Sequence, residues 1–179
     1  MKFEDNILAE YKGIEFDVYK DKGVTFMKWK NGDWIDNISE YASVFLGKCI
    51  SCKGFYKDSF KDFAYDSVLV AGLGFGLIPN ELSEVNKCSK IDVVEISQEV
   101  IDYNISSGHL NTNINIIKGD IFEYITNEKY DLIIIDTIWD ENEMSEEQVQ
   151  TLTSKFLTTN LNIGGALYIP IKNNWLINK

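Results

Sequence analysis

A glycine-rich turn at residues 68–82 constrains the fold of this chain more than any other feature. The stretch reads VLVAGLGFGLIPNEL, in which an apolar run of strand length is followed by three alternate glycines and then by a helical pattern. Gly72, Gly74 and Gly76 let the backbone turn tightly and approach a ligand closely, because glycine has no side chain. A strand, a glycine turn and a helix in this order predict the start of an α/β domain.

Strand and helix patterns continue to alternate up to residue 171. We expect strands at 68–71, 91–96, 114–117, 132–136 and 166–171, with helices at 78–87, 98–106, 121–126 and 145–161 between them. Short apolar strands linked by helices predict right-handed crossovers and a parallel sheet covered on both faces. The expected fold class is therefore α/β, with a Rossmann-like, doubly wound, mainly parallel sheet over residues 63–179.

The last predicted helix and strand suggest a domain that is shortened at its C-terminal end. A capping box from Ser145 to Gln148 opens the helix, and the glycines at 164–165 are expected to end it. We expect no further strand after 166–171, which leaves one edge of the sheet exposed. The N-terminal segment, or a second subunit in a homodimer, would cover that edge.

Residues 1–62 differ in pattern and are expected to form a separate N-terminal extension. Residues 14–19 alternate apolar and polar side chains, a turn follows at 21–23, and residues 24–29 form a second run, which together predict a β-hairpin. A short helix is expected at 39–47. Three aromatic residues of this segment are candidates for a lid over a site: Tyr11, Trp34 and Tyr41.

Charge excludes some classes of partner. The net charge is −11, and all 17 basic residues are lysines. Nucleic acid is disfavoured, because a polyanion is repelled at long range and no guanidinium can bind phosphate or guanine. A cationic or neutral small molecule is a better match to this negative charge.

We also expect no membrane partner and a cytoplasmic location, because no apolar run reaches roughly 20 residues and the first residues are too polar for a signal peptide.

The cysteines leave three interpretations open. Cys49 and Cys52 have C-x-x-C spacing, and the chain has one further cysteine, Cys88, and one histidine, His109. A structural zinc site needs four ligands and a redox pair is also possible, but reduced thiols in a half-buried segment are favoured. We expect no metal. His109 lies between a helix and a strand and is interpreted as structural or exposed.

The glycine turn does not match the two best-known phosphate-binding motifs. A dinucleotide site needs G-x-G-x-x-G, with its last glycine where Leu77 stands, and a Walker loop needs G-K-[ST]. The N-terminus of the helix that follows still offers N–H groups and a positive dipole end, which suit a carboxylate. A glycine turn with no ligand is the alternative.

Acidic residues follow three of the predicted strands. Parallel sheets bind ligands beyond the carboxyl ends of their strands. Glu95 lies about twenty residues beyond the glycines, where an acid accepts both ribose hydroxyls of an adenosine. Asp120 would accept a hydrogen bond from the exocyclic amine of a flat base that lies between apolar neighbours. Alternatively it would cap the following helix, and it could fill both roles. Asp136 would orient or deprotonate an amine nucleophile.

The segment after Asp136 supplies candidates for contact with an acceptor molecule. They are Thr137, Trp139 and Asp140, which all lie within four residues after Asp136. Trp139 fits equally well as a packing residue or as a wall of the acceptor pocket. Asp140 and Glu141 also fit a solvated loop.

Together these motifs resemble the class I S-adenosylmethionine-dependent transferases over residues 63–171. The matching segments are VLVAGLGFG, VVEIS, KGDIFEYI and YDLIIIDTIWD, and the closest likeness is to spermidine-synthase-like proteins, through IDVVEISQEVIDY, GDIFEYI and the preceding hairpin. The resemblance implies S-adenosylmethionine, or its decarboxylated form, as cofactor. It also implies that these residues hold the cofactor: Gly72, Gly74, Phe75, Gly76, Glu95, Ile96, Asp120, Ile121 and Asp136.

Three functions follow, with Asp136 as the catalytic residue in the first two. The first is methyl transfer to a small, amine-containing or cationic molecule. The second is aminopropyl transfer from the decarboxylated cofactor, although Phe75 stands where aminopropyltransferases carry an aspartate. The third is a non-catalytic ligand-binding or assembly protein on the same fold.

Overall fold

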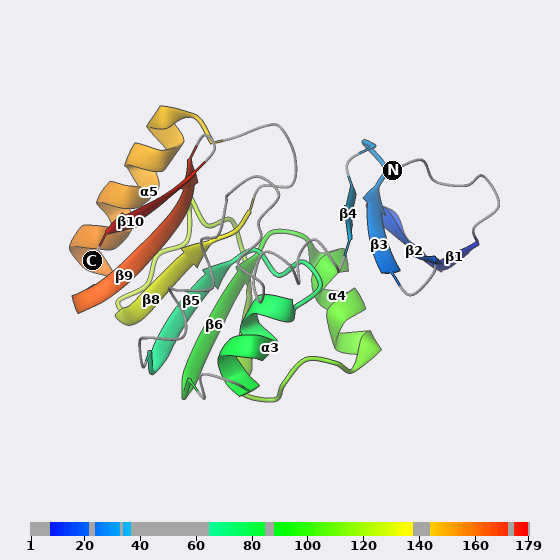
Figure 1. Ribbon diagram of the computed structural model, residues 1–179, viewed down its shortest axis with the longest axis horizontal. Helices are drawn as coiled ribbons and strands as arrows, with labels where there is room; N and C mark the ends of the chain where they lie inside the picture. The colour runs from blue at the N-terminus through cyan, green and yellow to red at the C-terminus, as the bar shows by residue number, and fades with distance from the viewer. Residues whose placement is uncertain are drawn as a thin grey trace.

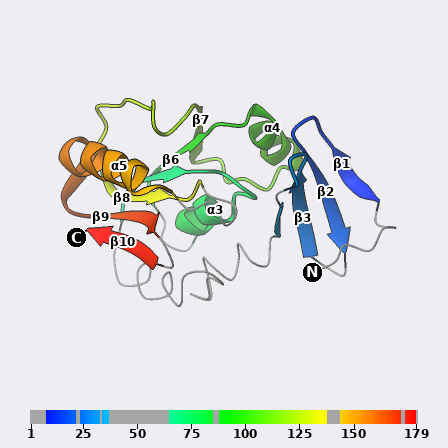
Figure 2. The same cartoon turned by 90° about the horizontal axis from the view of Figure 1, so that it is seen from above.

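The described part of the chain forms two β-sheets of different kinds. The computed structural model describes residues 8–21, 24–32, 34–36, 65–84, 88–137, 144–171 and 174–178. Within these residues a four-stranded sheet has the order β1-β2-β3-β4 and a six-stranded sheet has the order β10-β9-β8-β5-β6-β7 (Figure 1). The small sheet lies beside α4, at the opposite end of the molecule from β10 (Figure 2).

The predicted N-terminal hairpin is confirmed and extended by a strand on each side. The antiparallel strands are β1 (Ala9–Lys12), β2 (Phe16–Asp21), β3 (Val24–Trp29) and β4 (Trp34–Asp36). The period-two pattern places alternate side chains on one buried face, since Phe16 and Val18 of β2 are 0% and 1% exposed. Val18 pairs with Met27 across the hairpin, and Met27 is also fully buried. One face of the small sheet therefore joins the core.

The Rossmann-like parallel sheet is also confirmed. Its elements in chain order are β5 (Ser67–Ala71), α3 (Leu77–Glu84), β6 (Lys90–Glu95), α4 (Gln98–Ser107), β7 (Ile114–Lys118), β8 (Tyr130–Ile135), α5 (Glu146–Thr159), β9 (Leu161–Ile171) and β10 (Asn174–Asn178). All neighbours from β7 to β9 are parallel. Strand order reverses at β5, which has β6 on one side and β8 on the other, and this is the switch point at which such sheets bind ligands.

Alternate residues of each strand face two separate core clusters. Val68 and Val70 of β5 pack on the side of α3 and α4, whereas Leu69 and Ala71 pack on the side of α5. All four are fully buried. The sheet is thus covered on both faces, as an apolar strand without polar alternation predicts.

The C-terminal end differs from the prediction. A sixth strand, β10, pairs antiparallel with β9, from Asn174 opposite Ile171 to Asn178 opposite Leu167. The expectation that the sheet ends at its fifth strand is therefore wrong, and β10 covers the edge that the N-terminal segment or a second subunit was expected to cover. The apolar part of β10 is only WLI between asparagines, which is too short for a strand pattern to stand out.

The glycines at 164–165 do not end α5. Asn160 caps the helix, and β9 begins at the next residue, so both glycines lie inside the strand. They belong to an irregular stretch, in which Tyr130 pairs with Leu161 but Leu132 pairs with Ala166. The capping box at Ser145 is confirmed.

The short helix expected at 121–126 is absent, and a turn occupies 121–123 instead. The Asp120 side chain accepts from the Phe122 N–H at 2.9 Å, which tightens the backbone into a turn. Lys155 of α5 then donates to the carbonyls of Ile121 and Phe122 at 3.0 and 2.7 Å. These contacts satisfy carbonyl groups that a helix would have used for its own hydrogen bonds.

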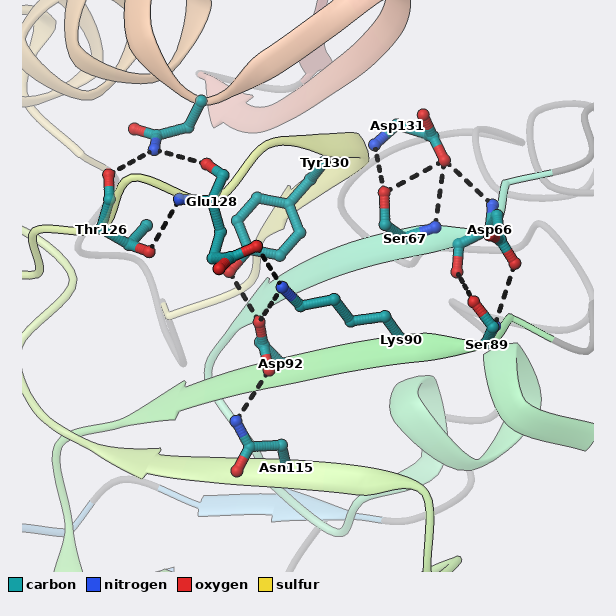
Figure 3. Close-up of polar contacts among 11 residues, drawn as sticks. Asp66, Ser67, Ser89, Lys90, Asp92, Asn115, Thr126, Glu128, Tyr130 and Asp131 are labelled. Carbon is teal, nitrogen blue, oxygen red and sulfur yellow. Dashed lines mark hydrogen bonds and ion pairs between the residues drawn. The ribbon is translucent and has the colours of Figure 1, made fainter.

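A polar network ties the strands together at their amino ends (Figure 3). Buried Asp92 of β6 accepts from the Tyr130 hydroxyl of β8 at 2.7 Å and from the Asn115 amide of β7 at 2.8 Å. Asp131 of β8 accepts from the Ser67 backbone N–H and hydroxyl of β5 at 3.0 and 3.1 Å. Because these bonds join four neighbouring strands, they help to set the register that aligns the opposite, carboxyl ends.

Candidate functional site

The predicted site residues gather where the parallel strands end. Ala71 of β5 pairs with Val94 of β6 and with Ile135 of β8, so the residues that follow these positions lie at adjacent strand ends. Gly72 N donates to the Val94 carbonyl at 2.9 Å, and Asp136 N donates to the Ala71 carbonyl at 2.8 Å. Gly119 N reaches the Glu95 carbonyl at 3.0 Å and places β7 beside them. The glycine turn, Glu95, Asp120 and Asp136 therefore share one edge of the sheet.

The glycine loop requires its glycines. Gly72, Gly74 and Gly76 all have positive φ angles. A Cβ atom at position 72 would lie 2.1 Å from the carbonyl oxygen of Asp136. Nothing larger than glycine fits there while β5 and β8 keep their pairing, so the loop backbone lies directly against the first residue of the fourth-strand motif.

Asn104, which the sequence patterns did not single out, and His109 hold this loop from the side of α4. Asn104 is fully buried, and its amide donates to the carbonyls of Gly74 and Val100 at 2.8 and 2.9 Å. His109 Nε2 lies 2.8 Å from the Phe75 carbonyl and must be its donor, because a carbonyl can only accept. A polar residue on the buried face of α4, beside Val100 and Ile101, was the available signal for Asn104. His109 is both exposed and structural.

Glu95 is buried, and its position suits ribose recognition. Its side chain is 6% exposed, and its two oxygens accept from the backbone N–H groups of Leu73 at 2.8 Å and of Ser97 at 2.7 Å. A carboxylate has about four acceptor positions, so two positions remain for a pair of hydroxyls. Ile96 follows and is 62% exposed, which leaves an apolar side chain at the surface beside the carboxylate.

The other predicted apolar contacts face the core. The Phe75 and Ile121 side chains are only 5% and 4% exposed and belong to the clusters on opposite faces of the sheet. Both side chains therefore pack in the core and do not face the edge of the sheet where the site lies. Asp120 is partly exposed and accepts from Phe122 N, so it caps a turn, because the helix that it was expected to cap is absent.

Asp136 is an acid of the described residues whose ionisation the protein makes harder. It follows β8 directly and lies against the glycine loop. Burial raises the pKa of its carboxyl from the usual value of 3.8 to about 6. Asp136 itself and Thr137 beside it are both partly exposed, so solvent and ligands can still reach this end of β8. Trp139 and Asp140 lie outside the described residues.

The N-terminal sheet is attached to α4 close to this edge. The Glu99 carboxylate of α4 accepts from the backbone N–H groups of Ile14 and Glu15 at 2.8 and 2.6 Å and from the Tyr11 hydroxyl at 3.1 Å. Ser97, the N-cap of α4, donates to the Glu15 carboxylate at 2.5 Å. Of the three aromatic candidates for a lid, Tyr11 thus holds the sheet to α4. Nothing is described of the Trp34 side chain, and Tyr41 lies outside the described residues.

No metal-binding cluster occurs among the residues that the structure describes. Cys88 is buried, its thiol donates to the Tyr65 carbonyl at 3.0 Å, and burial raises the pKa of that thiol to about 11. Cys49 and Cys52 lie outside the described ranges. No helix within those ranges is long and apolar enough to cross a membrane.

Comparison with known proteins supports the fold but supplies no close relative. No family model matches the chain, and no curated protein does. Spermidine synthase from Thermotoga maritima is 17% identical, with a TM-score of 0.61 over 90% of this chain and 55% of its own. The N-methyltransferase NodS from Bradyrhizobium japonicum WM9 is 21% identical, with a TM-score of 0.50 over 62% of this chain and 60% of its own. NodS has also been crystallised with S-adenosyl-L-homocysteine.

These likenesses confirm the resemblance at the level of the fold. The chain has the fold of class I S-adenosylmethionine-dependent methyltransferases and of spermidine synthase. A further example is the DhpI–SAH complex, which is 15% identical with a TM-score of 0.52 over 73% of this chain and 61% of its own. The chain spans about three fifths or less of each of these structures.

Proposed function

We propose that the protein is an S-adenosylmethionine-dependent transferase that acts on a small, amine-containing or cationic molecule. The observation that carries this proposal is the meeting of a glycine loop, a buried carboxylate and a carboxyl of raised pKa at three adjacent strand ends. The fold places them at the switch point of the sheet, which is where such sheets bind cofactors.

The residues present fit that cofactor. Glu95 has acceptor positions left for both ribose hydroxyls, and exposed Ile96 offers an apolar surface to one face of the adenine. Asp120 would accept from the adenine amine with the oxygen that does not cap the turn. The glycine loop supplies a backbone surface without side chains at Gly72. When bound, the cofactor contributes an activated carbon on a sulfonium, so the protein itself needs chiefly to align the nucleophile.

Asp136 would receive the proton of the amine nucleophile. With a pKa of about 6 it is mostly ionised at pH 7, yet it is a stronger base than an ordinary carboxylate. Thr137, Trp139 and Asp140 follow it and would line the acceptor side. The net charge of −11 favours a cationic acceptor over a nucleic acid. A cytoplasmic location and a homodimer remain predictions.

Aminopropyl transfer is the second candidate, and one observation favours it. Residues 63–179 make up about two thirds of the chain, so a likeness to spermidine synthase over 90% of it must include much of the N-terminal extension. NodS matches only 62%. Against aminopropyl transfer, Phe75 replaces the acid of the glycine loop and its side chain lies in the core.

Calorimetric titration tests the proposal. The wild-type protein would be titrated with S-adenosylmethionine, S-adenosylhomocysteine and the decarboxylated cofactor. We expect binding of at least one form, and a loss of about 1–3 kcal/mol in Glu95→Gln, because a buried acceptor of the ribose hydroxyls is replaced by an amide. Glu123→Gln, the same change at an exposed residue, is the matched control.

Two results would count against the proposal. Absence of heat with all three forms would leave a non-catalytic binding or assembly role on the same fold. Equal affinities in Glu95→Gln and wild type would mean that the cofactor binds elsewhere. Preference for the decarboxylated form would favour aminopropyl transfer over methyl transfer.

A further inference from the structure

The glycine loop has two of its carbonyl groups bound to side chains from α4 and the segment after it. Asn104 Nδ2 lies 2.8 Å from the Gly74 oxygen, and His109 Nε2 lies 2.8 Å from the Phe75 oxygen. These carbonyls belong to consecutive peptide units, and the N–H of the second unit, at Gly76, donates to the Leu73 carbonyl of the same loop at 2.7 Å. Because each peptide unit is planar and trans, the Gly74 carbonyl that is turned toward Asn104 turns the N–H of the same unit, at Phe75, the opposite way.

Both donors are themselves held in place. The Asn104 amide also donates to the Val100 carbonyl of its own helix at 2.9 Å, which identifies the nitrogen end of the side chain and fixes its rotamer. The His109 Nδ1 atom lies 2.5 Å from the hydroxyl oxygen of Ser107, two residues earlier in the chain. The loop therefore rests on a preorganised pair of donors.

Loop carbonyls decide which charged group the loop can accept. A carbonyl oxygen repels a carboxylate and attracts an ammonium group. Asn104 and His109 direct two of these oxygens to protein donors, and the Phe75 side chain, buried in the core, adds no acid. The loop leads into α3, which has no acidic residue in its first turn to compensate the positive end of the helix.

We propose that Asn104 and His109 are positioning residues that make the glycine loop select the carboxylate-bearing form of the cofactor over the decarboxylated form. This inference rests on the proposed function and sharpens it, because the carboxylate is what distinguishes the two forms. Neither residue touches the reacting atoms in this role. Each acts through a loop carbonyl.

The test compares affinities for the two cofactor forms in wild type and two variants. Asn104→Asp keeps the shape of the side chain but replaces both donor bonds with a carboxylate directed at the loop. His109→Ala removes the other donor at an exposed position, so it remains informative if the buried Asn104→Asp variant does not fold. Asn113→Asp is the matched control, because it adds the same charge at an exposed residue bonded to the Cys88 carbonyl, before β6 begins.

Wild type should bind S-adenosylmethionine more tightly than the decarboxylated form. Each variant should weaken S-adenosylmethionine binding by about tenfold and leave the decarboxylated form within about twofold, as expected for one lost charge-assisted contact. Equal weakening of both forms, no weakening, or a wild-type preference for the decarboxylated form would overturn the inference while the proposed function stands. Absence of binding of any form to wild type would instead overturn the proposed function.

Discussion

Asp136 and Asp131 stand at opposite ends of β8, and their environments shift their pKa values in opposite directions. Burial alone raises the pKa of Asp136 to about 6. Burial also works against the charge of Asp131, but hydrogen bonds from Asn162, Ser67 and Asp66 outweigh it and lower the pKa. One strand thus carries an acid that is costly to ionise at the candidate site and an acid that is stabilised as an anion at the far edge.

Asp136→Asn should stabilise the protein above pH 6. The folded pKa of Asp136 exceeds its unfolded value, so its contribution is fully present below about pH 4 and is lost as the pH rises through 6. An asparagine does not ionise, so the variant does not lose this stability. Compared with wild type, its free energy of unfolding should be about 1–3 kcal/mol higher at pH 8 and the same at pH 3.5. Denaturant unfolding at several pH values measures this.

The Asp131→Asn variant is the control, and it should behave in the reverse sense. A lowered pKa stabilises the fold above the unfolded value, so this variant should lose stability at pH 8 and much less at low pH. If Asp136→Asn were destabilised at pH 8, the carboxylate would have a partner that the geometry does not show.

If Asp136 is the base, transferase activity of wild type should rise through pH 6 and Asp136→Asn should be inactive.

At the scale of elements, α4 connects three parts of the molecule. Its first turn holds the N-terminal sheet through Glu99, and its N-cap Ser97 lies next to Glu95. Asn104 on its buried face holds the glycine loop. Gly13 shows how closely the sheet approaches, because a Cβ atom there would lie 1.4 Å from Glu99 Oε1.

Glu99→Ala should loosen the N-terminal sheet without unfolding the parallel sheet. The substitution leaves the N–H groups of Ile14 and Glu15 and the Tyr11 hydroxyl without their acceptor, and Gly13→Ala should have a similar effect by collision. Hydrogen exchange at residues 14 and 15 should accelerate by about tenfold or more, with exchange in β5 unchanged.

Asp102→Ala provides the comparison on the same helix, since the exposed Asp102 carboxylate bonds only within α4, to Gln98, in the contacts that the structure describes. Unchanged exchange at residues 14 and 15 in Glu99→Ala would show that aromatic packing, such as Tyr103 against Tyr11 and Phe16, holds the sheet without the carboxylate.

Elements with a clear period were predictable, and elements defined by long-range contacts were not. The hairpin and the parallel strands follow from apolar spacing, and the site acids follow from their places at strand ends. The turn after Asp120 was missed because Lys155, far along the chain, supplies the bonds that replace a helix. The roles of Asn104 and Glu99 were missed because their partners lie 30 and 85 residues away in sequence.

At the scale of the whole molecule, the net charge of −11 should affect capture of the acceptor. If the acceptor is a cationic amine, as proposed, its kcat/KM should fall by about threefold or more when the salt concentration rises from about 20 to 200 mM, because screening weakens long-range attraction. Kinetics with a neutral amine analogue are the control. A kcat/KM that does not depend on salt would indicate that the charge plays no part in capture.

The attachment of the N-terminal sheet to α4 also bears on the order in which the chain becomes buried during synthesis. The strands β1 to β4 can pair as soon as they leave the ribosome, but Glu99 follows Ile14 by 85 residues. At roughly 5–20 residues per second, about 4–17 seconds pass before α4 arrives. During that interval the apolar face with Phe16 lacks the Tyr103 ring that later packs against it, so this face stays uncovered until α4 has been made.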